Sequence, residues 1–454
     1  MTVYRLPINA WYGDQTVDVH FPDDWNVIAH WPRTPRPLND DDVLRALRQP
    51  CGQPPIREVA CGRSRPVIVV DDCTRPTPAA RVLPHILDEF QAAGIPANQV
   101  GIVVATGTHG PPGDSALRQK LGEVAWSRCR VHLHDDQREL VHLGRDSHGT
   151  PVLVNRHVAA ADYVIGIGGV YPQNSTGFGG GAKLALGVLG RRSIVNLHYG
   201  NPSEQGSYNI DNDFRRELDE IADMVRLETS VCLHVDAHRR AVRVTTGDHR
   251  AFYRDAVAFA RGPYCAAPPH DADLVVANAY PMDLSLTFLR SKAIAPLLRA
   301  APGSSRVLIA GCPEGVGRHG LYPFLDRGPA ARLRHLYRHL RVHPRQVPRA
   351  AASKAARVLQ PMSSRTLSGR AGGRTRAEGS GGARRAAARP IWLYSRNAAL
   401  ATRSTRPFRV TDSWDEILGQ IRIEQAGRPL RVALYPCSPL QVVGEHGADG
   451  GIQA

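Results

Sequence analysis

No stretch of the 454-residue sequence approaches the roughly 18–20 consecutive apolar residues that a membrane-spanning helix needs. Asp14 and Asp18 interrupt the N-terminal region before a signal-like apolar segment can form. We therefore expect a cytoplasmic protein without a membrane partner.

The eight cysteines include no Cys-x-x-Cys pair and no Cys/His cluster at the spacing of a zinc site. Such scattered cysteines are typical of reduced, mostly buried thiols. Hydrophobic residues make up 42% and charged residues 22% of the chain, as in ordinary globular proteins. At roughly 100–200 residues per domain, the length allows two to three domains.

The net charge of +15 comes from one segment. Sixteen lysines and arginines but only one acidic residue lie between Arg327 and Arg389, so the rest of the chain is neutral overall. No aromatic residue lies between positions 338 and 389, so base stacking has little support and a nucleic-acid partner is disfavoured. Residues 362–390 have almost no large apolar side chains, which predicts a disordered insertion, and residues 332–341 are expected to form a solvated helix.

Short β-branched segments alternate with helical patterns in the first half of the chain. Val67–Val70, Val100–Ala105 and Tyr163–Ile167 have the composition of buried strands. Ala80–Phe90 and Asp213–Val225 space their apolar residues as helices do. The alternation predicts a doubly wound parallel sheet, in which ligands bind beyond the carboxyl ends of the strands.

A second series of strands and helices begins near residue 272. Its predicted elements are Leu274–Ala277, Leu286–Leu298, Val307–Ala310, Trp414–Ile423 and Leu430–Leu434. We therefore expect a second α/β domain.

Reactive side chains follow the first two predicted strands. Two prolines stiffen the loop Asp71–Pro78, in which Arg75 would either clamp a carboxylate with its planar guanidinium or pair with an aspartate of its own loop. His109 follows the second strand between glycines, where it is either a proton shuttle or an exposed loop histidine.

A glycine-rich loop, residues 177–183, follows the third strand and is similar to a phosphate cradle. It departs from the P-loop pattern at Ala182 and Leu184, and residues 166–171 lack the third glycine of a dinucleotide fingerprint. Lys183 either pairs with a phosphate or serves as a point of covalent attachment.

His198 has apolar neighbours and is either a packed structural histidine or a metal ligand, although a lone histidine needs further ligands from a cofactor. The Asp72–Pro76 loop, the Ala105–His109 loop, the Gly177–Lys183 loop and His198 together resemble the nickel-pincer lactate racemase family. The order and separation of these motifs agree with the family over roughly the first 300 residues.

The resemblance implies an α/β fold of two domains with parallel Rossmann-like sheets and an interdomain active-site cleft. Residues 1–270 would form the cofactor-binding domain, and residues 271–454 would form the C-terminal domain that contains the disordered insertion. The implied cofactor is nickel as a pincer complex of pyridinium-3,5-bisthiocarboxylic acid mononucleotide. A histidine would complete the square-planar geometry that suits Ni(II).

The resemblance also implies a role for each motif residue. His198 would ligate nickel, and Lys183 would be the residue that can be joined to the cofactor through a thioamide. Arg75 and Lys292 would hold the substrate carboxylate, while His109 would take the hydroxyl proton as a hydride leaves the α-carbon. The other implied cofactor-binding residues are Asp72, Thr74, Gly179, Gly180 and Gly181.

Two positions depart from the family pattern. Racemisation calls for a proton-transferring group on each face of the substrate, but Gln173 replaces the second family histidine and an amide does not shuttle protons. Leu289 replaces the glutamine that the family places three residues before Lys292. This loss of a polar contact makes a larger or less polar substrate than lactate plausible.

The leading hypothesis is a nickel-pincer-dependent isomerase, a racemase or epimerase of a small-molecule 2-hydroxy acid that depends on cofactor-synthesis proteins as partners. A second hypothesis keeps the cofactor but limits hydride exchange to one face, as in an oxidoreductase. A third is a non-catalytic protein that uses residues 327–389 as an anion-binding arm. The sequence leaves the substrate, the modification of Lys183 and the oligomeric state open.

Overall fold

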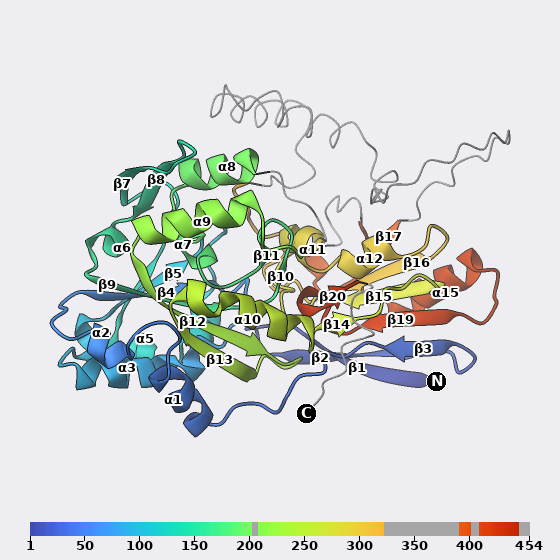
Figure 1. Ribbon diagram of the computed structural model, residues 1–454. Coiled ribbons are helices and arrows are strands. Elements are labelled where there is room, and N and C mark those ends of the chain that lie inside the picture. Colours follow the sequence, from blue (N-terminus) through green and yellow to red (C-terminus); the bar gives the residue numbers. More distant parts are fainter. Residues whose placement is uncertain (202–207, 322–389, 401–407, 445–454) are drawn as a thin grey trace, which may run out of the picture.

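The computed structural model describes residues 1–201, 208–321, 390–400 and 408–444. Each of its two lobes is built around a six-stranded sheet (Figure 1). None of the helices in these described ranges is long and apolar enough to cross a bilayer. The predicted insertion at 362–390 and the predicted basic helix at 332–341 lie outside the described residues.

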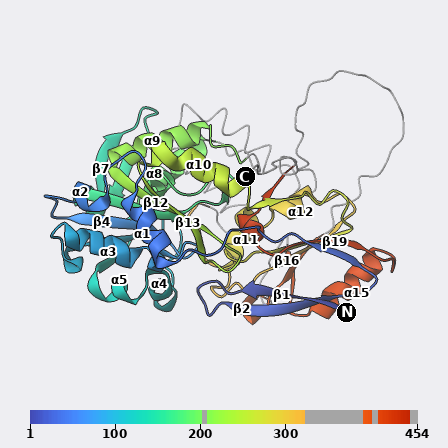
Figure 2. The ribbon, with the colours of Figure 1, turned by 60° about the horizontal axis from the view of Figure 1, so that its bottom comes forward.

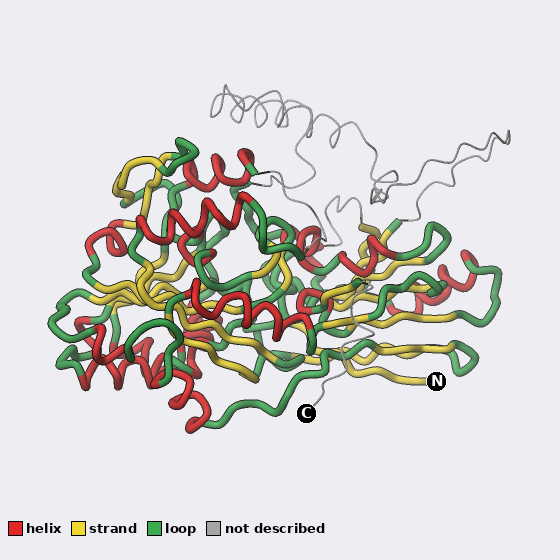
Figure 3. Tube along the Cα trace, in the orientation of Figure 1, coloured by secondary structure: helices red, strands yellow, loops and turns green. Residues whose placement is uncertain are grey.

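The sheet of the first lobe has the strand order β13–β12–β9–β4–β5–β6. Figure 3 shows the strands of this sheet lying side by side, with helices around them. Its strands are β4 (Pro66–Asp71), β5 (Gly101–Ala105), β6 (Arg130–Leu133), β9 (Tyr163–Gly169), β12 (Leu227–Val235) and β13 (Ala241–Gly247). All neighbouring strands are parallel except β12 and β13, which form an antiparallel edge pair. The predicted doubly wound parallel sheet is confirmed, with one antiparallel edge strand in addition.

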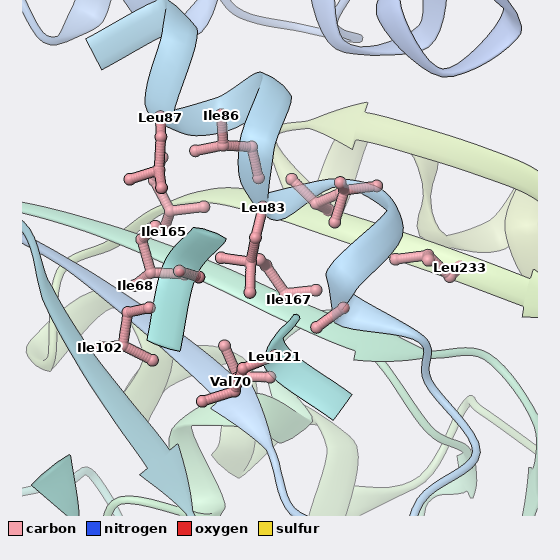
Figure 4. Close-up of a cluster of buried hydrophobic side chains, with 14 of the residues drawn as sticks. Ile68, Val70, Leu83, Ile86, Leu87, Ile102, Leu121, Ile165, Ile167 and Leu233 are labelled. Carbon is pink, nitrogen blue, oxygen red and sulfur yellow. The ribbon is translucent and has the colours of Figure 1, made fainter. Parts of the chain in front are cut away.

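Helices cover both faces of the first sheet, because the side chains of each buried strand alternate between the two faces. On one face, Leu83 and Leu87 of the covering helix join Ile68, Ile165 and Ile167 of the strands in one buried cluster (Figure 4). The helices of this face are α1 (Asp40–Arg48), α2 (Ile56–Val59), α3 (Leu83–Ala92), α4 (Asp114–Leu121) and α5 (Glu123–Arg128). Those of the other face are α6 (Arg156–Ala160), α7 (Lys183–Leu186), α8 (Arg191–Gly200) and α9 (Asp213–Met224).

Smaller elements complete the first lobe. Two antiparallel hairpins are formed by β7 (Leu140–Arg145) with β8 (Pro151–Asn155) and by β10 (Pro172–Gln173) with β11 (Gly177–Phe178). Helix α10 (His249–Arg261) packs on β12 and β13. Its apolar side joins a cluster that also contains Met282 and Leu440, so this cluster links the two lobes.

The sheet of the second lobe has the order β18–β17–β16–β15–β19–β3, and all its neighbouring strands are parallel. Its strands are β3 (Asn26–Ala29), β15 (Leu274–Asn278), β16 (Ser305–Ile309), β17 (Ile391–Tyr394), β18 (Phe408–Thr411) and β19 (Arg431–Tyr435). The N-terminal β3 therefore lies in the sheet of the C-terminal half. The domain boundary at residue 270 stays a prediction.

The hairpin of β1 (Thr2–Ile8) and β2 (Gln15–Phe21) covers one face of this sheet together with α15 (Trp414–Glu424) (Figure 2). The opposite face carries α11 (Leu286–Lys292) and α12 (Ala295–Arg299). The prediction of one continuous helix over Leu286–Leu298 is wrong. The helix is interrupted at residues 293–294, because Pro296 in the first turn of α12 has no N–H to donate and its ring disfavours a helical turn before it.

Candidate active site

The loops after β4, β5 and β9 meet at the carboxyl edge of the first sheet, as parallel strands require. Asp72, Arg75 and His109 come from the first two of these loops, and Lys183 begins α7. Helix α11 of the second lobe lies beside β10 (Figure 1) and adds Lys292, which donates a hydrogen bond to Gln173 of that strand. The structure thus brings the predicted site residues together where the two lobes meet.

Asp72 and His109 form a hydrogen-bonded pair with 2.6 Å between Oδ2 and Nδ1. The other carboxylate oxygen of Asp72 accepts hydrogen bonds from the backbone N–H and the hydroxyl of Thr74. The His109 side chain is only 12% exposed, so the alternative of an exposed loop histidine is wrong. Thr74 orients the aspartate, and the aspartate orients the imidazole.

The environment of this pair sets its protonation. Burial alone would raise the pKa of Asp72, but His109, Arg75 and Thr74 hold it well below its usual value. Burial lowers the pKa of His109 despite the opposing influence of Asp72. At neutral pH the imidazole is therefore neutral, with its Nδ1 proton donated to Asp72 and its Nε2 lone pair able to accept a proton.

Arg75 is buried, and its Nη1 atom has no hydrogen-bond partner among the described residues. The nearby aspartates have other partners, since Asp71 pairs with Lys120 at 2.8 Å and Asp72 pairs with His109. The alternative of an ion pair within the loop is therefore not what the structure shows. A buried guanidinium with an unsatisfied donor is suited to an anionic ligand.

The glycine-rich loop is tightly packed. A Cβ atom on Gly181 would lie 2.8 Å from Nη2 of Arg215, and a Cβ atom on Gly179 would lie 2.6 Å from the carbonyl oxygen of Gly169. The N–H groups of Gly179 and Gly181 donate to protein acceptors, so they do not point to an anion. Close packing accounts for these two glycines, and a cofactor-binding role for the loop stays a prediction.

Three cationic side chains, Arg75, Lys183 and Lys292, interact electrostatically at this site. Burial, together with Arg75 and Arg215, lowers the pKa of Lys183 to about 7. Burial, together with Arg75 and Lys183, brings the pKa of Lys292 well below its usual value. A bound anion would relieve this mutual repulsion.

His198 lies on α8, where its Nδ1 donates a hydrogen bond of 2.8 Å to the carbonyl oxygen of Ile194. A carbonyl oxygen only accepts, so the proton is on Nδ1 and the lone pair is on Nε2. Burial lowers the pKa of His198 to about 4, which keeps the ring neutral. Packing against Phe214 fits a structural histidine, and the unprotonated Nε2 is also what a metal requires.

Gln173 accepts a hydrogen bond of 2.7 Å from Nζ of Lys292, and its buried Nε2 has no partner among the described residues. Leu289 is completely buried in the core of the second lobe, against Val275 and Ala277. Packing therefore accounts for a leucine at this position, and the inference of a larger substrate receives no support from it.

The sequence interpretation missed His319. Its ring centroid lies 5.0 Å from that of His109, and the backbones of the two residues form an isolated β-bridge. The Leu321 N–H donates to Nδ1 of His319 at 3.2 Å, so the neutral ring carries its proton on Nε2. His319 follows no strand and belongs to no motif, so only the tertiary contact reveals it.

Comparison with protein families gives a match to the lactate racemase N-terminal domain over residues 12–207. The lactate racemases of Lactiplantibacillus plantarum and Thermoanaerobacterium thermosaccharolyticum are each 25% identical to this chain over 291 residues. Each alignment covers 62% of this chain and 68% of the relative.

Two solved structures share the fold. The lactate racemase apoprotein from Thermoanaerobacterium thermosaccharolyticum matches with a TM-score of 0.68 and 19% identity, covering 97% of this chain and 100% of that one. A protein from Thermotoga maritima matches with a TM-score of 0.55 and 15% identity, covering 90% of this chain and 99% of that one. These likenesses support the α/β fold described above.

Proposed function

Because the chain is a lactate racemase-like protein of the isomerase class, we propose that it is a racemase or epimerase of a 2-hydroxy acid that uses a nickel-pincer nucleotide. The observation that carries this proposal is the cationic cluster of Arg75, Lys183 and Lys292 beside the Asp72–His109 pair. A carboxylate substrate and an anionic nucleotide both need such positive charge. The division into domains 1–270 and 271–454, the cleft between them and the cytoplasmic location stay predictions.

The residues present fit the implied cofactor. The Nε2 lone pair of His198 is a suitable nickel ligand, and the lowered pKa of Lys183 leaves much of its amine neutral and nucleophilic at pH 7. Lys183 would be the covalent attachment point, with the cationic cluster balancing the charge of the mononucleotide. When bound, the cofactor would supply a hydride acceptor, which no side chain provides.

In the proposed reaction the unsatisfied guanidinium of Arg75 binds the substrate carboxylate, whose negative charge offsets the repulsion that lowers the pKa of Lys292 and so favours the ammonium form of that lysine. His109 accepts the hydroxyl proton on Nε2 as the α-carbon loses its hydrogen. Asp72 holds the ring through Nδ1 and stabilises the imidazolium that forms. The pair thus serves as the general base.

We assign proton transfer for the opposite enantiomer to His319, whose ring must first release the hydrogen bond from the Leu321 N–H so that Nδ1 is able to accept the hydroxyl proton. Gln173 is not able to take this role, and burial raises the pKa of Tyr171, which leaves its phenol a poor base. His319 packs beside His109 and Phe288 and is tied to His109 through the backbone. His319→Asn is expected to lower kcat/KM by about 10²–10⁴ without altering the metal content, whereas His142→Asn, at an exposed histidine, should change neither.

A second candidate function is suggested by Gln173, because a protein with one working face would exchange hydride with an outside ketoacid. An α-deuterated hydroxy acid distinguishes the two functions. Return of the label in the inverted hydroxy acid supports racemisation, whereas transfer of the label to an added ketoacid supports the oxidoreductase.

The test of the proposed function is metal analysis with intact-protein mass spectrometry on protein expressed together with a pincer-cofactor synthesis pathway. Wild type should contain nickel and an adduct the size of a mononucleotide. His198→Ala should lose nickel, and Lys183→Ala should lose the adduct. Folded wild-type protein with neither nickel nor adduct, in cells that demonstrably make the cofactor, would refute the proposal.

A further inference from the structure

A second group of ligating side chains lies apart from the candidate active site. Asp146 and His148 belong to the turn between β7 and β8, and Glu217 lies on α9. One ligand atom from each of these residues lies within 4.8 Å of the other two. Figure 1 shows the β7–β8 hairpin beside α8 and α9, and contacts of α8 with both β8 and α9 agree with this view.

His148 and Glu217 line a cavity of about 30 Å³, and Asp146 lies next to them. The cavity is lined by His148, Thr150, Asn196, Gly200, Asn201 and Glu217. A volume of about 10–15 Å³ is enough to hold one water molecule, so this space is large enough for a monatomic cation with a bound water.

Two buried oxygen atoms at this place have no hydrogen-bond partner among the described residues. They are Oδ2 of Asp146, a residue 6% exposed, and Oδ1 of Asn196, a residue 3% exposed. Both atoms accept hydrogen bonds and do not donate them when the carboxyl is ionised. Leaving such an atom buried and unsatisfied costs about 1–3 kcal/mol. A cation would satisfy both atoms, whereas a protonated Glu217 would satisfy only the Asp146 carboxylate.

The remaining oxygen atoms are held in place by neighbouring donors. Oδ1 of Asp146 accepts the N–H groups of His148 at 3.0 Å and Thr150 at 2.7 Å. Oε1 of Glu217 accepts the hydroxyl of Thr150 at 2.8 Å, and Oε2 accepts the amide of Asn201 at 2.5 Å. The carboxylates are therefore positioned before any ligand binds.

Among the described residues, no lysine or arginine is paired with the carboxylates of this cluster. In the part of the chain that the structure describes, neither Asp146 nor Glu217 takes part in an ion pair with lysine or arginine. Burial and a side-chain hydrogen bond with Asp146 raise the pKa of Glu217 to about 7, because a protonated Glu217 is able to donate to that carboxylate. Either a shared proton or a bound cation must therefore relieve the repulsion between the two carboxyl groups.

We propose that Asp146, His148, Asn196 and Glu217 bind one divalent cation, Zn²⁺ or Mn²⁺, at this place between the β7–β8 turn, α8 and α9. Two carboxylates, one amide oxygen and one imidazole form a mixed donor set. The imidazole favours these borderline ions over Ca²⁺ and Mg²⁺, which prefer oxygen ligands alone. His148 is exposed and provides the solvent-accessible side of the site.

The cation stabilises the helix that carries His198. Asn196 and His198 both lie on α8, so a metal bound to Asn196 and Glu217 would tie α8 to α9. The site does not depend on the proposed function, because none of its four ligands belongs to the candidate active site. It would hold α8 in place with or without the pincer cofactor.

The experiment uses the full chain, expressed without the cofactor pathway, stripped with a chelator and titrated with Zn²⁺ and Mn²⁺ by isothermal calorimetry. Wild type and His198→Ala should each bind one equivalent. The double variant Asp146→Asn, Glu217→Gln should bind at least ten-fold more weakly. The control Asp213→Asn removes an exposed carboxylate from α9, the helix that carries Glu217, and should bind the cation as wild type does. Because His198→Ala keeps this site, failure here is distinct from failure of the nickel proposal.

His148→Gln provides a second variant that should fold normally, since it changes an exposed side chain. We expect it to weaken Zn²⁺ binding more than Mn²⁺ binding, because it removes the only imidazole of the site. Equal binding by wild type and the double variant would overturn the proposal. So would absence of binding to wild type. A higher melting temperature of Glu217→Gln at pH 8 would then indicate that a proton, and not a cation, relieves the repulsion between the two carboxyl groups.

Discussion

Replacing Lys183 by methionine should stabilise the cofactor-free protein, although the same lysine is proposed to hold the cofactor. Its amine has no hydrogen bond or ion pair among the described residues and lies near two arginines. Methionine has a similar length and no charge. Lys183 thus lowers the stability of the cofactor-free fold in return for its proposed role in holding the cofactor.

The magnitude follows from the lowered pKa of Lys183. A fall from 10.5 in the unfolded chain to about 7 in the folded protein corresponds to a cost on the order of 4 kcal/mol at pH 7, since each pKa unit is about 1.4 kcal/mol. This is an upper value because the side chain is only partly buried. Between pH 7 and 10.5 the unfolded state binds more protons, so the cost is complete below pH 7 and declines as pH rises through this window.

The assay compares melting temperatures of wild type and Lys183→Met from pH 6 to 9.5 in buffers without phosphate or sulfate, which would bind to the cationic cluster. The advantage of the variant should be largest at pH 6 and shrink toward pH 9.5. The control is Lys120→Met, at a fully buried lysine that pairs with Asp71 and donates to two carbonyl oxygens. This control should be destabilised by about 3–5 kcal/mol because Asp71 is left unpaired. A Lys183→Met protein no more stable than wild type at pH 6 would refute the reasoning.

Asp72→Asn should lower kcat by about 10²–10⁴, because an amide does not stabilise the imidazolium of the general base, and steady-state kinetics at unchanged nickel content would check this. Asp72 also stabilises the fold above pH 4 and loses this effect as the pH falls toward its depressed pKa. In thermal melts the advantage of wild type over Asp72→Asn should therefore decrease in acid. An advantage that grows in acid would contradict the pairing of Asp72 with His109. Arg75→Lys should raise KM about ten-fold or more through loss of the planar fork, and an unchanged KM would exclude carboxylate binding by this residue. Gly181→Ala should destabilise by about 1–3 kcal/mol more than Gly94→Ala in thermal melts, because both glycines have positive φ but only at Gly181 does a Cβ atom meet a neighbour.

The local sequence pattern was sufficient to predict the buried strands of the first lobe and the loops that follow them. The β-branched composition of β4, β5 and β9 marked them as buried strands, and their carboxyl ends necessarily share one edge of a parallel sheet. The position of the side chains on the loops after those strands therefore followed from sequence. The helix over Leu286–Leu298 was misjudged because its apolar spacing outweighed the local effect of Pro296.

The sequence by itself determined which residue types follow each strand of the first sheet, and with them His109, Arg75 and Lys183. Only the tertiary structure decided that β3 joins the distant β19, that Lys292 contacts Gln173, and that His319 lies against His109. The physical reason is that hydrophobic periodicity describes how a segment buries one face. It carries no information about which distant segment covers that face, so contacts between lobes and between far parts of the chain arise only when the whole chain packs.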